Sequence, residues 1–119
     1  MSDLNLNVFN YKELLNRFMD EKDVVNEVIA IFVEKIDRQF VIIEDGIKVD
    51  DLEKIKFEAH NIKGGALNLC AKEFGLAAKN LEDACKNKDN SNLNCLFANL
   101  KDSFKRLKKE LIDNNYYIE

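Results

Sequence analysis

Hydrophobic residues recur every three or four positions in four long stretches of the chain, with polar residues between them. This spacing places the apolar side chains on one face of an α-helix, so it predicts four amphipathic helices over about residues 20–46, 50–69, 74–85 and 93–111. The positions expected to face the core are Val25, Val28, Ile29, Phe32, Ile36, Phe40, Ile43, Leu52, Ile55, Ala59, Ile62, Ala66, Leu69, Phe74, Ala77, Ala78, Leu81, Cys85, Leu93, Phe97, Leu100, Phe104, Leu107 and Leu111.

Polar residues with the spacing of helix caps mark two helix starts. Asn10 and Glu13 have capping-box spacing, which predicts a further short helix over about residues 10–18. Asp50 and Glu53 repeat this spacing, so we expect the cap of the second long helix at Asp50.

Amphipathic helices joined by short loops bury their apolar faces against one another. The sequence therefore predicts an all-α fold, an antiparallel four-helix bundle with an additional short N-terminal capping helix. The absence of proline and the presence of only four glycines argue against a turn-rich β-sandwich or barrel. Without an internal repeat or linker, we expect a single domain over residues 1–119, with its core at about 8–112.

Charge and hydropathy narrow the classes of partner. The net charge is −4 and the pI is about 5.1, which argues against a nucleic-acid-binding protein. We interpret the basic positions of the last helix as its solvated face, since acidic residues are interspersed among them; they are Lys101, Lys105, Arg106, Lys108 and Lys109. No apolar run has the roughly 18 residues of a membrane span, and no signal peptide is recognisable, so we expect a cytoplasmic protein without membrane contact.

The three cysteines are odd in number and scattered, which favours reduced and mostly buried thiols. Cys70, Cys85 and Cys95 follow His60 with gaps of 10, 15 and 10 residues. These gaps fit no zinc pattern, so we expect no metal site.

The chain has one histidine, His60, at the edge of the apolar stripe of its helix. Lys63 and Gly64 are neighbours on the same surface because they follow three and four residues later. Two adjacent glycines, Gly64 and Gly65, cost about 0.8–1 kcal/mol each within a helix, so their presence needs a reason. A bare backbone beside an imidazole would let another protein approach, and an ammonium group would stabilise a phosphoryl group on the ring.

The segment of residues 59–66, Ala-His-Asn-Ile-Lys-Gly-Gly-Ala, resembles the signature of histidine phosphotransfer (HPt) domains of two-component phosphorelays. The resemblance continues upstream over residues 9–17 and 28–34, and downstream over residues 74–82. It implies a phosphorylated His60, with Lys63 steadying the phosphoryl group or the partner's aspartate. It also implies that Gly64 gives clearance and that Gly65 allows close packing.

Glu82 matches the position where the family often has Gln or Glu on the next helix. Such a group near the imidazole would hold the Nδ1 proton and direct Nε2 outward. The alternative is that Glu82 is an ordinary solvated acid on a helix surface.

The resemblance implies a phosphocarrier that is not an enzyme and has no nucleotide site or cofactor of its own. Its partners would be response-regulator receiver domains, which supply Mg²⁺, and a sensor or hybrid histidine kinase. His60 would accept the phosphoryl group from a receiver aspartate and pass it to another receiver. We expect a monomer that docks through Gly64, Gly65 and Leu67, together with residues of the short first helix.

Two positions depart from the family pattern. Leu67 stands where a glycine or small residue is common, seven residues after the histidine, and Cys70 stands where glycine is frequent, ten residues after it. Leu67 lies on the same helix face as His60, so it is either an apolar docking contact or a residue that restricts the choice of partners.

The sequence leaves other interpretations open. A lone histidine on a helix is usually only a surface residue, and paired glycines can mark tight helix packing. The chain could also be the phosphoacceptor domain of a larger chemotaxis-type histidine kinase, a non-transferring adaptor that binds receiver domains, or an unrelated structural bundle.

Overall fold

The computed structural model describes residues 7–118, and their regular structure is entirely helical. The helices are α2 (Tyr11–Arg17), α3 (Lys22–Lys48), α4 (Leu52–Asn68), α5 (Lys72–Lys86) and α6 (Leu93–Asp113). No strand occurs within 7–118, which confirms the predicted all-α class. None of the helices in this range is long and apolar enough to cross a membrane.

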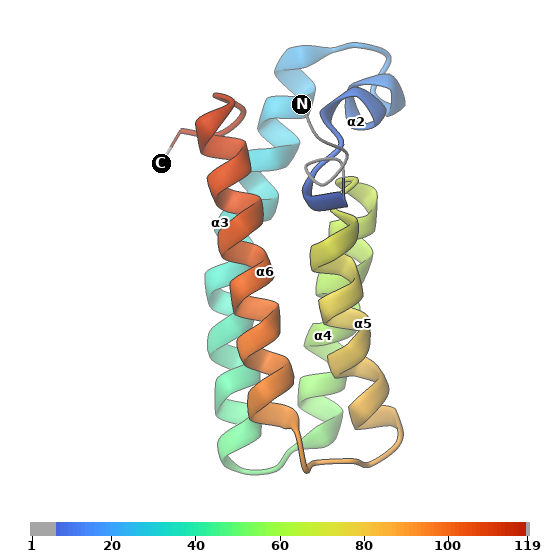
Figure 1. The fold of residues 1–119 in the computed structure, drawn as a ribbon, viewed down its shortest axis with the longest axis vertical. Coiled ribbons are helices and arrows are strands. Elements are labelled where there is room, and N and C mark those ends of the chain that lie inside the picture. Colours follow the sequence, from blue (N-terminus) through green and yellow to red (C-terminus); the bar gives the residue numbers. More distant parts are fainter. Residues whose placement is uncertain (1–6, 119) are drawn as a thin grey trace.

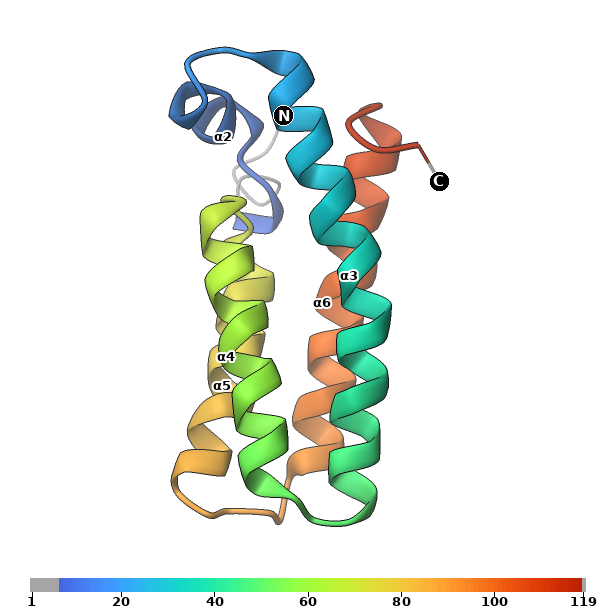
Figure 2. The ribbon, with the colours of Figure 1, turned by 180° about the vertical axis from the view of Figure 1, so that it is seen from behind.

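The four long helices run along the longest axis of the molecule, and successive helices point in opposite directions (Figures 1 and 2). α4 packs most closely on α5, while α3 packs on α4 and α6 packs on α5. The short α2 lies near the end of the molecule where α3 begins and α4 ends (Figure 1). The overall dimensions are 42 × 26 × 23 Å.

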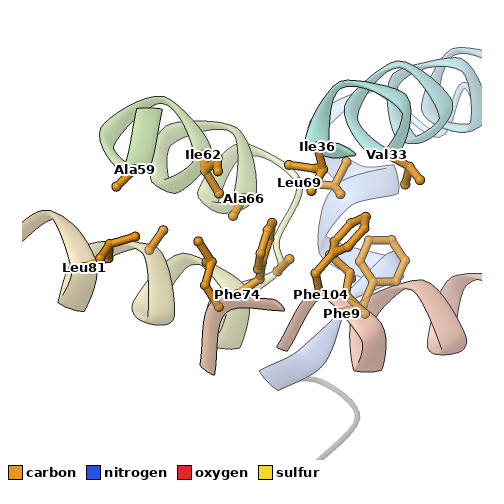
Figure 3. Packing of buried hydrophobic residues seen from close by; sticks show 14 of the residues in the cluster. Phe9, Val33, Ile36, Ala59, Ile62, Ala66, Leu69, Phe74, Leu81 and Phe104 are labelled. Carbon is orange, nitrogen blue, oxygen red and sulfur yellow. The ribbon is translucent and has the colours of Figure 1, made fainter. Parts of the chain in front are cut away.

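The apolar stripes predicted from the sequence meet in one core (Figure 3). Most of the expected positions are buried, and Val28, Phe32, Phe40, Leu52 and Ala77 are partly buried against them. The ring of Phe40 meets the rings of Phe74, Phe97 and Phe104 edge-on, with centroids 5.6–6.4 Å apart. Edge-to-face pairs of this kind stabilise a core by about 0.5–1.5 kcal/mol beyond the area that they bury.

The helix caps agree with the sequence at α2 and differ by one residue at α4. The Asn10 side chain accepts a hydrogen bond of 3.1 Å from the Glu13 N–H, as the capping spacing predicted. At α4 the capping side chain belongs to Asp51, which accepts from the Lys54 N–H at 3.1 Å, so the predicted cap at Asp50 is wrong. The reason is that Asp50 ends α3 in a left-handed conformation with φ 57° and is already part of that turn.

Cys70 ends α4 in the same left-handed conformation, with φ 61°. The Cys70 N–H donates to the Leu67 carbonyl at 3.1 Å, and the Ala71 N–H donates to the Ala66 carbonyl at 2.9 Å. These two bonds form a Schellman motif, in which glycine is the favoured residue. A glycine at this position, as is frequent in HPt sequences, would adopt the positive φ without strain. In this chain the position is occupied by Cys70, whose side chain is buried.

α2 is fastened to this end of α4. Arg17 Nη1 donates to the carbonyl oxygens of Leu67 and Asn68 at 3.1 and 3.2 Å, at the negative end of the α4 dipole. The Asn10 N–H donates to the Cys70 carbonyl at 3.1 Å. α2 and its cap are thus held beside the surface that carries Leu67.

We predict that Cys70→Gly is more stable than Cys70→Ala by roughly 1 kcal/mol, since both lose the thiol and only alanine keeps a Cβ at a positive φ. Urea unfolding of both variants measures the difference. Equal stability, or a more stable alanine variant, would show that the backbone at this turn carries no strain.

Candidate functional site

His60 lies in the middle of α4 with 62% of its side-chain surface exposed. Its neighbours Ala59 and Ile62 are buried, so the imidazole is on the outer side of the helix, as the stripe predicted. α4 continues without interruption through Gly64 and Gly65 to Asn68, which confirms that both glycines are within the helix.

The carboxylate of Glu82 on α5 lies directly against the imidazole. Glu82 Oε2 is 2.8 Å from His60 Nδ1, although only 3% of the Glu82 side chain is exposed. An ionised carboxylate can only accept a hydrogen bond, so Nδ1 carries the proton and donates it to Glu82. In the neutral form of the ring, Nε2 then carries the lone pair. The alternative interpretation of Glu82 as a solvated surface acid is wrong, because the residue is buried.

Two lysines compensate the charge of Glu82. Lys63 Nζ is 2.8 Å from Oε1, and Lys86 Nζ is 3.5 Å from Oε2. The structure thus brings Lys63 to Glu82, while the resemblance to HPt domains implied that Lys63 steadies a phosphoryl group or an incoming aspartate. Lys86 was not predicted from the sequence, although its spacing of four residues from Glu82 on one helix is a recognised signal for an ion pair.

The environment of Glu82 lowers its pKa. Burial alone raises the pKa, but the contacts with Lys63 and His60 and the charge of Lys86 outweigh it and lower the pKa from 4.5 to about 2. Glu82 is therefore ionised throughout the physiological range, which is the condition for Nδ1 to act as the donor.

The two glycines have different surroundings. A Cβ on Gly64 would meet no other atom within 4 Å, so the helix surface beside His60 is open. A Cβ on Gly65 would lie 3.0 Å from Cε1 of Phe32 on α3, so glycine allows the close approach of the two helices there. Gly64 thus leaves the helix surface bare, and Gly65 lies where α3 and α4 pack closely.

Leu67 is 48% exposed, and it also packs across α5. A Cβ on Gly75 would lie 3.1 Å from Leu67 Cδ2, so the large side chain on α4 is accommodated by a glycine on α5. The departure from a small residue at this position is therefore compensated within the fold, and the outer part of the leucine stays accessible.

A groove of about 820 Å³ runs between α3 and α4. Its α4 wall includes Asn61, Gly65 and Asn68, which are close in sequence to His60 and Gly64. Its other lining residues are Phe18, Val28, Ile31, Phe32, Lys35, Arg38, Gln39, Ile42, Glu58 and Leu69.

Within residues 7–118, no group of three or more His, Cys, Asp or Glu side chains is arranged to hold a metal ion.

The lowered pKa of Glu82 predicts a specific dependence of stability on pH. The ionised Glu82 stabilises the fold fully above its unfolded pKa near 4.5, and this contribution is lost as the pH falls towards its folded pKa of about 2. We expect the stability advantage of the wild type over Glu82→Gln, up to about 3 kcal/mol at neutral pH, to shrink between pH 4.5 and 2.

Thermal unfolding of both proteins across this pH range measures the effect, with Glu34→Gln, which removes an exposed carboxylate of α3, as the control. An advantage that stays constant down to pH 2 would mean that Glu82 is not held in its ionised form by the fold.

A comparison with models of protein families gave a match that covers most of the chain. A family model described as the Hpt domain matches residues 27–110, which include His60, Lys63, Gly64 and Glu82. Comparisons with curated proteins and with solved structures gave no match. Hpt domains are phosphocarriers that take part in phosphotransfer in two-component systems. Since the match covers well over half of its 119 residues, the chain belongs to the Hpt domain family.

Proposed function

We propose that this protein is a phosphorelay intermediate, which accepts a phosphoryl group on His60 from a receiver-domain aspartate and passes it to another receiver domain. The observation that carries the proposal is the 2.8 Å contact between His60 Nδ1 and the buried Glu82. A ring whose Nδ1 proton is held inward has its lone pair on Nε2, and the exposed ring offers that nitrogen to a partner.

In the proposed transfer, the Nε2 lone pair attacks the phosphorus of the aspartyl phosphate. The bond between phosphorus and the aspartate oxygen breaks, and its electron pair stays on the aspartate carboxylate. The Nδ1 proton stays on the ring, which becomes cationic, and the adjacent Glu82 carboxylate stabilises that new charge. The reverse sequence delivers the phosphoryl group to the next receiver.

The remaining site residues support binding. Lys63 has the reach and charge to contact the phosphoryl oxygens or the partner's aspartate. Gly64 gives clearance for the partner backbone, Gly65 keeps α3 close, and Leu67 offers apolar contact area. The scaffold in this proposal is an antiparallel bundle of the four long helices, with the short N-terminal helix as a cap beside the docking surface.

In this proposal, the partner proteins supply the metal site and the phosphoryl group. The receiver domain would contribute the Mg²⁺ site and the acidic pocket, and a sensor or hybrid kinase would supply the phosphoryl group to the relay. The protein would work as a cytoplasmic, monomeric carrier without a nucleotide site.

We predict that His60→Gln abolishes labelling by a phosphorylated receiver and leaves the helical content unchanged, because the side chain is largely exposed. Incubation with receivers that carry labelled aspartyl phosphate, followed by a test for acid-labile and base-stable label, measures this. A non-transferring adaptor would bind the receiver and stay unlabelled. A domain of a chemotaxis-type kinase would be labelled by that kinase and ATP without a receiver.

We predict that Gly64→Gln slows transfer from a receiver by roughly tenfold or more, since the added side chain occupies the open surface beside His60. The same variant should unfold at higher urea, by up to about 1 kcal/mol, because glycine is the weaker helix former. Gly64→Ala is the matched control, with the gain in helix stability and little added bulk. Equal transfer rates for the glutamine variant and the wild type would remove the reason proposed for this glycine.

A further inference from the structure

The His60 site contains one cation more than its buried carboxylate requires. Glu82 has two ammonium groups at its oxygens, Lys63 at 2.8 Å from Oε1 and Lys86 at 3.5 Å from Oε2. The two lysines differ in exposure, since 22% of the Lys63 side chain and 55% of the Lys86 side chain are exposed. A single ion pair would be enough to balance the charge of Glu82.

In the proposed phosphotransfer, the phosphoryl group and Glu82 compete for the ammonium group of Lys63. Lys63 follows His60 by three residues on the same helix surface, so a phosphoryl group on the ring would attract its ammonium. Among the described residues, the Lys63 ammonium, 2.8 Å away, is what compensates Glu82 Oε1. If Lys63 turned to the phosphoryl group, a buried carboxylate oxygen would lose its counter-ion, which is costly.

Lys86 is placed to remove this conflict. It is on α5, one turn after Glu82, with its ammonium already near the carboxylate and its flexible stem largely in solvent. We infer that Lys86 is a reserve counter-ion, which takes over the charge of Glu82 and so allows Lys63 to move from Glu82 to the phosphoryl group on His60. The inference rests on the proposed function and makes Lys86 a positioning residue, which acts through Glu82 and Lys63.

A simpler role is available for Lys86, that of an exposed ion pair with no bearing on transfer. The chain offers a matched control for it in Lys79, which is also on α5, is also 55% exposed, and pairs with Asp83 at 2.7 Å. Removing Lys79 takes away a comparable surface ion pair and leaves both ammonium groups that contact Glu82, those of Lys63 and Lys86, in place.

The test follows the lysine ammonium signals by NMR in the full chain, before and after phosphorylation of His60 with phosphoramidate, a small donor that needs no docking. In the wild type, the signals of Lys63 and Lys86 are both expected to shift on phosphorylation. In Lys86→Met the Lys63 signal is expected to stay where it was, since Glu82 retains that ammonium. Lys86→Arg and Lys79→Met should both show the wild-type shift of Lys63.

Transfer from a phosphorylated receiver gives a second readout. Lys86→Met is expected to lower the maximal rate about three- to fivefold, the size of one partly exposed charge contact, without changing the receiver concentration at half-maximal rate. Lys86→Arg should restore the rate, and Lys79→Met should leave it unchanged.

The outcomes separate the two levels of the proposal. If His60 is phosphorylated and Lys63 shifts equally in Lys86→Met and in the wild type, the reserve role of Lys86 is wrong and the relay function stands. If neither phosphoramidate nor a receiver phosphorylates His60, the proposed function fails and the inference fails with it.

Discussion

The site depends on one buried carboxylate. Glu82 is on α5, and its ionised oxygens hold a histidine and a lysine of α4. Removing a carboxylate from water is expensive unless charges and hydrogen bonds replace the lost hydration. Around Glu82, the imidazole N–H and the lysine ammonium groups replace that hydration. The ionised carboxylate then orients the imidazole by accepting a hydrogen bond from Nδ1. The orientation of the only histidine is therefore set by the packing of one helix on another.

Glycines on the inner faces of the helices allow α4 to pack closely on both α3 and α5. Gly65 lets Phe32 of α3 approach α4, and Gly75 on α5 receives the Leu67 side chain of α4. Gly64 differs because it faces open space and contributes nothing to packing. Each of these glycines lowers helix stability. Gly65 and Gly75 face neighbouring helices and allow short distances between them, whereas Gly64 faces solvent and leaves the surface bare.

Most of the fold could be predicted from the sequence because the helical period decides which face is apolar, and that rule is local. The cap of α4 was misplaced by one residue because Asp50 is part of the turn that ends α3, and a cap spacing does not reveal such a turn. The burial of Glu82 was left open because it depends on how two helices meet across 22 residues. Lys86 was missed because only the position of Glu82 gives it a role.

The site around His60 is rich in positive charge, although the chain as a whole is acidic. The chain carries a net charge of −4, yet two ammonium groups lie beside Glu82, the carboxylate that contacts His60. A phosphoryl group with nearly two negative charges would be repelled by Glu82 alone. In the proposed transfer, the two ammonium groups and the cationic ring together balance the phosphoryl group and Glu82. In this proposal the carboxylate orients the nucleophile without opposing the phosphoryl group that the ring receives, because the second lysine adds the charge that the phosphoryl group requires.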